Sequence, residues 1–132
     1  MNKEFDELFN RTVVFKDCEL LEYQEGLVRI STIVNASNTN PYGKAHGGYL
    51  YTLCDSLAGL LCYSMGSYAV TLQASINYMK EAKENDVLYL EGKAVHNGRT
   101  TKVVDVEVHN QDEKLLCKAT FTMYVIATAD EQ

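Results

Sequence analysis

The stretch Asn40–Leu61 reads NPYGKAHGGYLYTLCDSLAGLL: a polar loop runs into an apolar segment that carries one carboxylate, Asp55, in its middle. This is the only long apolar segment of the sequence whose pattern is helical rather than alternating. After Gly47, apolar side chains cover most of the circumference, which is typical of a helix buried on nearly all sides. They are Leu50, Leu53, Cys54, Leu57, Leu60 and Leu61. We therefore expect the rest of the chain to fold around this helix.

The remaining stripe of this helix is small and polar, because such residues recur there at three- and four-residue steps. Its members are Gly48, Thr52 (or Tyr51), Asp55, Gly59 and Cys62 or Tyr63. An unpaired carboxylate in an apolar helix is costly, so we interpret Asp55 as a functional acid. The alternative is a structural acid that is bonded to a neighbouring Tyr or to a backbone group.

Segments with strand character surround the helix. Residues 26–34 alternate and are rich in β-branched side chains, which predicts a strand. Four further strands are predicted after a turn near residues 65–67, at 69–79, 86–96, 100–110 and 115–126, with Asn97-Gly98 as a two-residue hairpin turn. Phe5, Leu8, Phe9 and Val13 have helical spacing and predict a short amphipathic helix near the start. The order is helix, strand, long buried helix and four antiparallel strands, an α+β fold.

The composition describes one acidic domain. The 132 residues, of which 46% are hydrophobic, suffice for a single domain at 1–132, with a helix and extension at 1–25. The formal net charge of −6 disfavours a nucleic-acid partner, because such binding depends on Lys and Arg. The first residues carry acids where a signal peptide is apolar, and no apolar run reaches the roughly 20 residues of a spanning helix. We expect a cytoplasmic protein without a membrane partner.

The cysteines and histidines do not form a recognisable ligand pattern. Cys18, Cys54, Cys62 and Cys117 are scattered, which predicts buried free thiols and fits a reducing compartment. Cys54 adjoins Asp55 but points about 100° away from it, toward the leucine face, so we interpret it as core. His46, His96 and His109 do not share an element at ligand spacing. We expect neither a metal nor a cofactor.

The sequence also resembles a known family. A buried helix with enough strands to curl about it resembles the hot-dog fold, and the string NPYGKAHGGYLYTLCD resembles the signature of the PaaI-like acyl-CoA thioesterases. In that family Asn, Gly, His-Gly-Gly and a helical Asp recur at these spacings. SINYMKEA and NGRTTKVVDVEV extend the likeness to about residues 26–126. The resemblance implies that an acyl-CoA is the substrate, that Asn40 and the Gly47 amide polarise the thioester carbonyl, and that Asp55 and the hydroxyl of Thr71 hold the water.

The chemistry of a thioester fits these residues. A helix N-terminus offers free N–H groups to a developing oxyanion, and at Gly47 and Gly48 no side chain blocks the approach. Asp55 can act as general base or as nucleophile. Gly47 and Asp55 are eight positions apart, about 12 Å along the helix, so one carbonyl cannot touch both in one chain. We therefore expect a homodimer with shared sites, and the resemblance adds a homotetramer as a further state.

Substrate contacts are less determined by the sequence. Coenzyme A carries phosphates, so Arg99 and Lys80, with Lys83 and Lys102, are candidate cations. The acyl pocket is predicted along the stripe of Asp55, where Thr52, Gly59 and Tyr63 suggest room for a flat or modest acyl group. The expected substrate is an aromatic or short-to-medium acyl-CoA. His46 is assigned a supporting role, in orienting the loop or capping the helix, with substrate contact as its alternative.

Several alternative interpretations of these residues and of the whole chain compete with the thioesterase hypothesis. Asn40 could be a turn residue only, and Thr71 lies in a strand that favours β-branched residues in any case. For the whole chain, one alternative is a non-catalytic hot-dog module that binds acyl-CoA or acyl-carrier ligands. Another is a hot-dog dehydratase with His46 as the base.

Overall fold

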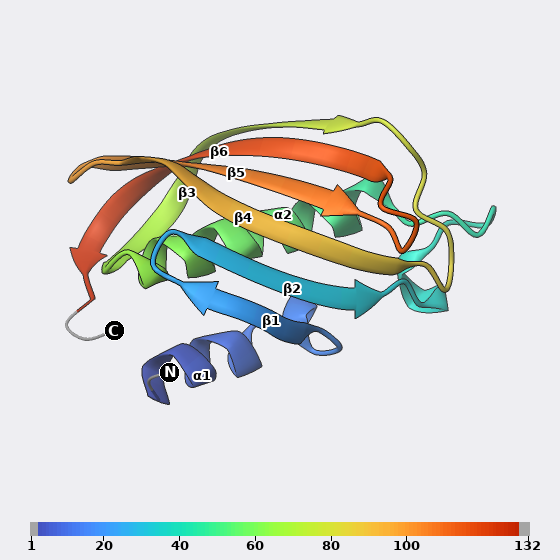
Figure 1. Cartoon of the computed structure of the whole chain (residues 1–132), viewed down its shortest axis with the longest axis horizontal. Coiled ribbons are helices and arrows are strands. Elements are labelled where there is room, and N and C mark those ends of the chain that lie inside the picture. Colours follow the sequence, from blue (N-terminus) through green and yellow to red (C-terminus); the bar gives the residue numbers. More distant parts are fainter. Residues whose placement is uncertain (1–2, 130–132) are drawn as a thin grey trace.

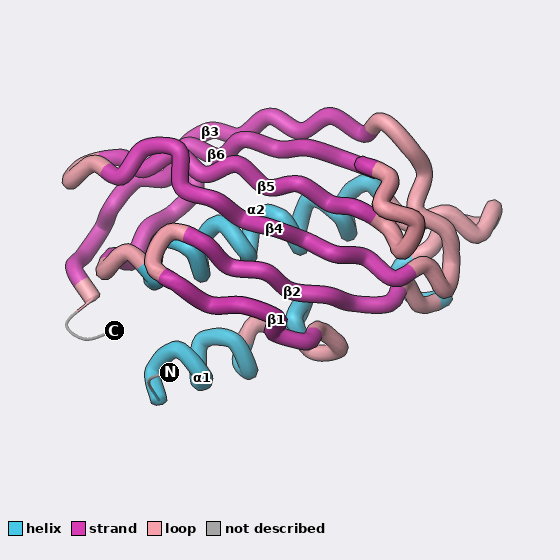
Figure 2. The backbone as a smooth tube through the Cα atoms, in the orientation of Figure 1, coloured by secondary structure: helices cyan, strands magenta, loops and turns pink. Residues whose placement is uncertain are grey.

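The computed structural model describes residues 3–129 of the chain. Two α-helices and six strands alternate with two short 3-10 turns (Figures 1 and 2). In chain order the elements are α1 (Lys3–Arg11), η1 (Val13–Phe15), β1 (Glu19–Gln24), β2 (Leu27–Ile33), η2 (Ala36–Asn38), α2 (Gly47–Ser64), β3 (Ser67–Tyr78), β4 (Val87–Asn97), β5 (Thr101–His109) and β6 (Leu115–Thr128). The predicted helix near the start, the long buried helix and the five predicted strands are all present.

The six strands form one antiparallel sheet in the order β1-β2-β4-β5-β6-β3. The sheet curves around α2, which lies along its concave face (Figure 1). This arrangement confirms the predicted α+β hot-dog architecture. Strand β3 pairs with β6 on one side only, so its other edge is unpaired within the described chain.

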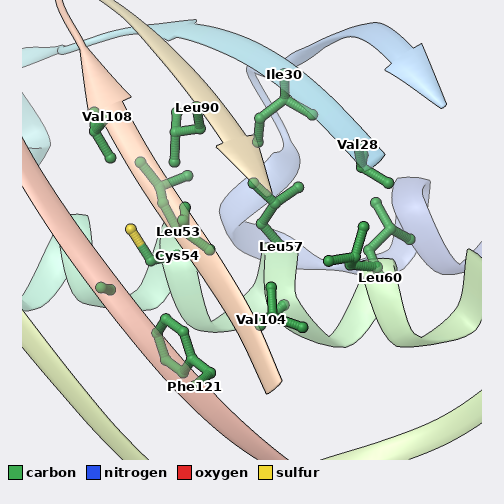
Figure 3. Close-up of a cluster of buried hydrophobic side chains, with 14 of the residues drawn as sticks. Val28, Ile30, Leu53, Cys54, Leu57, Leu60, Leu90, Val104, Val108 and Phe121 are labelled. Carbon is green, nitrogen blue, oxygen red and sulfur yellow. The ribbon is translucent and has the colours of Figure 1, made fainter. Parts of the chain in front are cut away.

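The core lies between α2 and the sheet. Leu53, Leu57 and Leu61 are completely buried, and Figure 3 shows Leu53 and Leu57 among side chains of β2, β4, β5 and β6. Gly92 on β4 makes this contact close, because a Cβ atom there would lie 3.3 Å from Cγ of Leu57. The apolar circumference predicted for the helix is therefore buried as expected, and burial of this kind supplies the main driving force for folding.

The small and polar stripe of α2 is the part of the helix that the sheet leaves uncovered. Gly48 and Thr52 are exposed, and Asp55 and Gly59 are half-buried. Tyr63 differs, because α1 packs over this end of the helix and leaves the ring only 1% exposed. Its hydroxyl lies 3.3 Å from Oε2 of Glu4 in α1.

Two expectations about the strands were wrong. Strand β1 was not predicted, because ELLEYQ lacks strict alternation and a register shift between Leu20 and Glu22 breaks its pattern. The turn after β4 is not a two-residue hairpin, since Asn97 pairs with Lys102 and neither Asn97 nor Gly98 has the positive φ that such a turn requires.

The cysteines agree with the prediction of free thiols. All four are unpaired; Cys54, Cys62 and Cys117 are buried, and Cys18 is partly buried. A hydrogen bond with Cys117, together with burial, raises the pKa of the Cys54 thiol, which keeps it protonated and supports its interpretation as core. Among residues 3–129, no helix is long and apolar enough to cross a membrane.

Candidate active site

The N-terminus of α2 presents free amide groups. His46 is the residue before the helix, and its carbonyl oxygen accepts hydrogen bonds from the N–H groups of Tyr49 and Leu50 at 3.1 and 3.2 Å. The N–H groups of Gly47 and Gly48 donate no hydrogen bond within residues 3–129, as expected for the first turn of a helix. These two donors carry the positive end of the helix dipole and suit an oxygen that gains negative charge.

The side chain of His46 is exposed and makes no capping hydrogen bond. The backbone N–H of His46 donates to the carbonyl of Asn38 at 2.9 Å. That bond fixes the loop to the start of the helix. Capping by the imidazole, one of the predicted roles, is absent from the described chain.

Asn40 shapes the loop before the helix. Its Oδ1 accepts the N–H groups of Tyr42 at 2.9 Å and Lys44 at 3.2 Å, and its own N–H donates to the carbonyl of Lys44 at 2.7 Å. Gly43 completes the turn with a φ of +75°, where a side chain would be strained. With Oδ1 engaged, Nδ2 remains as an oriented donor. Asn40 therefore is a turn residue and can also serve a ligand.

Asp55 and Thr71 lie on different elements and are hydrogen-bonded to each other. The Thr71 hydroxyl on β3 donates to Oδ1 of Asp55 on α2 at 2.5 Å. This bond fixes one carboxylate oxygen and leaves Oδ2 available to a water or a substrate. The two groups to which the resemblance assigns the water are thus adjacent within one chain, and the hydrogen-bond partner of Asp55 is Thr71 rather than a Tyr or a backbone group.

Tyr78 belongs to the same region but was not singled out from the sequence. Its hydroxyl donates to the carbonyl oxygen of Gly47 at 2.7 Å. A Cβ atom at Gly47 would lie 3.3 Å from Cζ of Tyr78, so the ring packs directly on the first turn of α2. Burial raises the pKa of this hydroxyl, which keeps it a donor at neutral pH. The signals in the sequence were its place at the end of an alternating strand and within the string SINYMKEA.

Within residues 3–129, hollows at three places border α2. The first, here called the loop groove, measures about 480 Å³ and borders the helix N-terminus; it is lined by Asn40, Tyr42, Lys44, Ala45, Gly47, Leu50, Tyr78, Met79, Lys80, Glu81 and Ala82. The second, of about 520 Å³, includes Gly48 and Thr52. The third, here called the α1 pocket, measures about 350 Å³ and includes Gly59 and Tyr63. The residues predicted for one acyl pocket are therefore divided between two hollows.

The predicted cations are also divided. Lys80 lines the loop groove together with Lys44, whose Nζ lies 2.9 Å from Oε2 of Glu81. Arg99 is exposed in the turn between β4 and β5, at the opposite end of α2 from Gly47 (Figure 1). Lys102 is only 4% exposed and donates to Asn97 Oδ1 and to the Gly98 carbonyl. Its interpretation as a phosphate ligand was wrong, because its charge is engaged inside the turn.

Comparison with known proteins agrees with this architecture. A curved antiparallel sheet around one helix, with an acid on the helix and free amides at its N-terminus, defines a hot-dog protein of the thioester-hydrolase class. The family model described as "Thioesterase superfamily" matches residues 42–117. The chain belongs to the thioesterase superfamily.

Individual relatives support the same assignment. The acyl-coenzyme A thioesterase PaaI of Escherichia coli K12 is 29% identical over 96 residues, which cover 73% of this chain and 69% of the relative. A hypothetical thioesterase of Streptococcus pneumoniae TIGR4, solved with coenzyme A, is 47% identical with a TM-score of 0.89 and covers 97% of this chain and 98% of that chain. A Streptococcus mutans UA159 protein bound to acetyl CoA is 48% identical with a TM-score of 0.86, covering 88% and 94%.

Two further structures of the S. pneumoniae protein carry single replacements by alanine, one of an aspartate and one of a threonine 16 residues later. Asp55 and Thr71 have the same separation of 16 residues.

Proposed function

We propose that this protein hydrolyses acyl-CoA thioesters at two equivalent sites, each built from two copies of the chain. One copy supplies the Gly47 amide and Asn40, and the other supplies Asp55 and Thr71. The observation that carries the proposal is the hydrogen bond of 2.5 Å by which Thr71 fixes the Asp55 carboxylate on the uncovered stripe of α2. The bound coenzyme A and acetyl CoA in the two streptococcal relatives support the substrate class.

The separation along α2 supports the sharing of sites. Gly47 and Asp55 are eight positions apart, which corresponds to about 12 Å of helix, so one thioester carbonyl does not reach both in one chain. The edge strand β3 supplies a surface for a second copy, with Val70 49% and Leu72 63% exposed. Edge strands of this kind are normally covered or paired. Two-fold pairing along β3 would set the two α2 helices side by side and antiparallel.

The proposed reaction needs few groups. The thioester carbonyl oxygen accepts a hydrogen bond from the Gly47 N–H, with Asn40 Nδ2 as the second donor, so the charge of the tetrahedral intermediate is stabilised. Asp55 either removes a proton from the attacking water or attacks the carbonyl carbon itself, and in the second case a water afterwards hydrolyses the mixed anhydride to release the acid. The C–S bond then breaks and the electron pair leaves on sulfur. A thiol of pKa near 8.5 departs readily as thiolate, so a strong general acid is unnecessary.

The loop groove fits the coenzyme end of the substrate. It borders Gly47 and is lined by Lys80, whose ammonium group can face phosphates, and by Lys44, whose Nζ is paired with Glu81. The replaced aspartate and threonine in the S. pneumoniae variants support the pair Asp55 and Thr71 as the reactive half. The four free thiols favour a reducing compartment, so we place the protein in the cytoplasm. Association of dimers into a tetramer stays a prediction.

Replacing Gly47 by proline tests the oxyanion site. Proline is favoured at the first position of a helix, and the extended backbone of His46, with φ −63° and ψ 137°, suits a residue before proline. Gly47→Pro should therefore fold but lack the N–H, and we expect kcat to fall by about 10²- to 10³-fold. Gly47→Ala is the matched control, because it adds the same Cβ beside Tyr78 and keeps the N–H. Equal losses in the two variants would contradict the role of the amide.

Replacing Tyr78 by phenylalanine tests whether the helix terminus must be held in place. The ring stays, but the bond to the Gly47 carbonyl is lost, and we expect kcat to fall by about 3- to 10-fold, the value of one ordinary hydrogen bond. KM for the acyl-CoA should change less than kcat, because the bond positions the oxyanion donors rather than the substrate. A rise in KM with unchanged kcat would instead make Tyr78 a substrate contact.

A further inference from the structure

We propose that the α1 pocket receives the acyl group and that the N-terminal segment 8–15 limits the length of that group. This inference rests on the proposed thioesterase function and adds a substrate class to it: uncharged, predominantly apolar acyl groups of limited size. The pocket is lined by Leu8, Thr12, Phe15, Ser56, Gly59, Leu60, Tyr63, Ser67, Tyr68, Ala69 and Ile126.

The pocket adjoins the proposed reaction centre. Its helix residues Ser56 and Gly59 follow Asp55 directly on α2, so Gly59 lies about 6 Å further along the axis. Its strand residues precede Thr71 on β3, ending at Ala69. The hollow therefore begins one residue beyond Asp55 on α2 and two residues before Thr71 on β3, and it lies toward the C-terminal end of α2. The loop groove, which suits the coenzyme, lies at the other end of the helix.

The lining selects for an apolar occupant. Its polar side chains are those of Ser, Thr and Tyr, which all carry hydroxyl groups. Among the lining residues that the structure describes, none is charged. The Thr12 hydroxyl is already engaged, since it donates to the Leu8 carbonyl at 2.7 Å. A carboxylate at the end of an acyl chain would lose its hydration here and would meet no cation among the lining residues. An alkyl or aryl group would lose water favourably.

The N-terminal segment 8–15 covers the pocket, and aromatic contacts of α1 and η1 hold this cover in place. Phe5 and Phe15 are 1% and 3% exposed, and Phe9 stacks between them with ring centroids 6.2 and 5.0 Å apart. Phe5 also packs on Tyr23 of β1, with the two ring centroids 3.9 Å apart, so α1 is packed against the sheet as well as against α2. This ordered cover lies outside residues 42–117, the part matched by the family model. The segment proposed to limit the acyl group therefore lies outside the part that the family model matches, while the S. pneumoniae relative covers 97% of this chain.

Gly59 controls the volume of the pocket. A Cβ atom at this position would meet nothing within 4 Å, so a larger side chain can enter the hollow. Leucine is also a better helix former than glycine, and Gly59→Leu should fold at least as well as the wild type. Leu8→Ala acts in the opposite direction, because it removes part of the cover. Asn10→Ala is the control, since Asn10 is exposed on α1 and is not among the lining residues.

The test is a profile of kcat/KM over straight-chain acyl-CoAs from acetyl upward. For wild type we expect a rise of about fourfold per methylene, the value of burying each one, until the chain meets the cover and the profile falls. Gly59→Leu should move the maximum to shorter chains and Leu8→Ala to longer chains, while Asn10→Ala keeps the wild-type profile. Succinyl-CoA should react at least tenfold more slowly than butyryl-CoA.

The outcomes separate the two proposals. Unchanged maxima in both Gly59→Leu and Leu8→Ala, in proteins that hydrolyse acyl-CoAs, would overturn the assignment of the pocket and leave the thioesterase proposal standing. Equal rates for succinyl-CoA and butyryl-CoA would overturn the preference for uncharged groups. Failure of wild type to hydrolyse any member of the series would overturn the proposed function, and the pocket assignment with it.

Discussion

Asp55→Asn is expected to lower kcat for acyl-CoA hydrolysis by about 10²- to 10⁴-fold, the range that a general base contributes. The amide has the shape of the carboxylate, and its oxygen can still accept the hydrogen bond that Thr71 donates to Oδ1 at 2.5 Å. The variant loses the negative charge but should keep its fold. Release of thiol from aromatic, short-chain and long-chain acyl-CoAs measures the loss, and the melting temperature checks that the fold is intact.

Asp112→Asn provides the matched control for this change. Asp112 is exposed in the turn between β5 and β6 and lines none of the three hollows around α2, so the same replacement there should leave turnover as in wild type. If Asp55→Asn hydrolysed acyl-CoAs as fast as wild type, Asp55 would be a structural acid. Tight thioester binding without hydrolysis by wild type would favour the non-catalytic module, and hydration of an enoyl-CoA would favour the dehydratase with His46 as base.

The parts of the fold that were predictable are those whose signal is local. The circumference of α2 and the alternation of β5 can be read within one segment, and both are buried as their patterns indicate. Strand β1 was missed because an edge strand is only half covered and its register shift removes the alternation. Lys102 was misread because a lysine in a strand is ordinarily solvated, whereas here Asn97 and the Gly98 carbonyl enclose its ammonium group.

The candidate site could also be predicted from the sequence only in part, because its contacts join distant segments. Asp55 and Thr71 could be paired from the sequence only because a family pattern spans the 16 residues between them. Tyr78 reaches Gly47 across 31 residues, and no local pattern announces that contact. The α1 pocket joins residues from Leu8 to Ile126, so its existence depends on how α1 packs on α2. Periodicity identifies which face of an element is buried but not which distant side chain meets it.

Two inactive variants are expected to restore activity when they are combined in one dimer. Gly47→Pro lacks the oxyanion donor and keeps Asp55, while Asp55→Asn lacks the acid and keeps the Gly47 amide. In a mixed dimer with shared sites, one site receives both intact groups and the other receives both replaced groups. Because one of two equivalent sites is then intact, the mixed dimer should show about half of the wild-type turnover per dimer.

Co-expression of the two variants with different affinity tags, followed by purification on both tags, gives the mixed dimer for this assay. Each parent homodimer, purified in the same way, should stay at least about 10²-fold below wild type. The restored turnover is expected because Gly47 and Asp55 are about 12 Å apart on one α2 helix, a distance that only a second, antiparallel helix can close. A mixed dimer as inactive as its parents would show that each site lies within one chain, and the pairing along the β3 edge would then have no catalytic role.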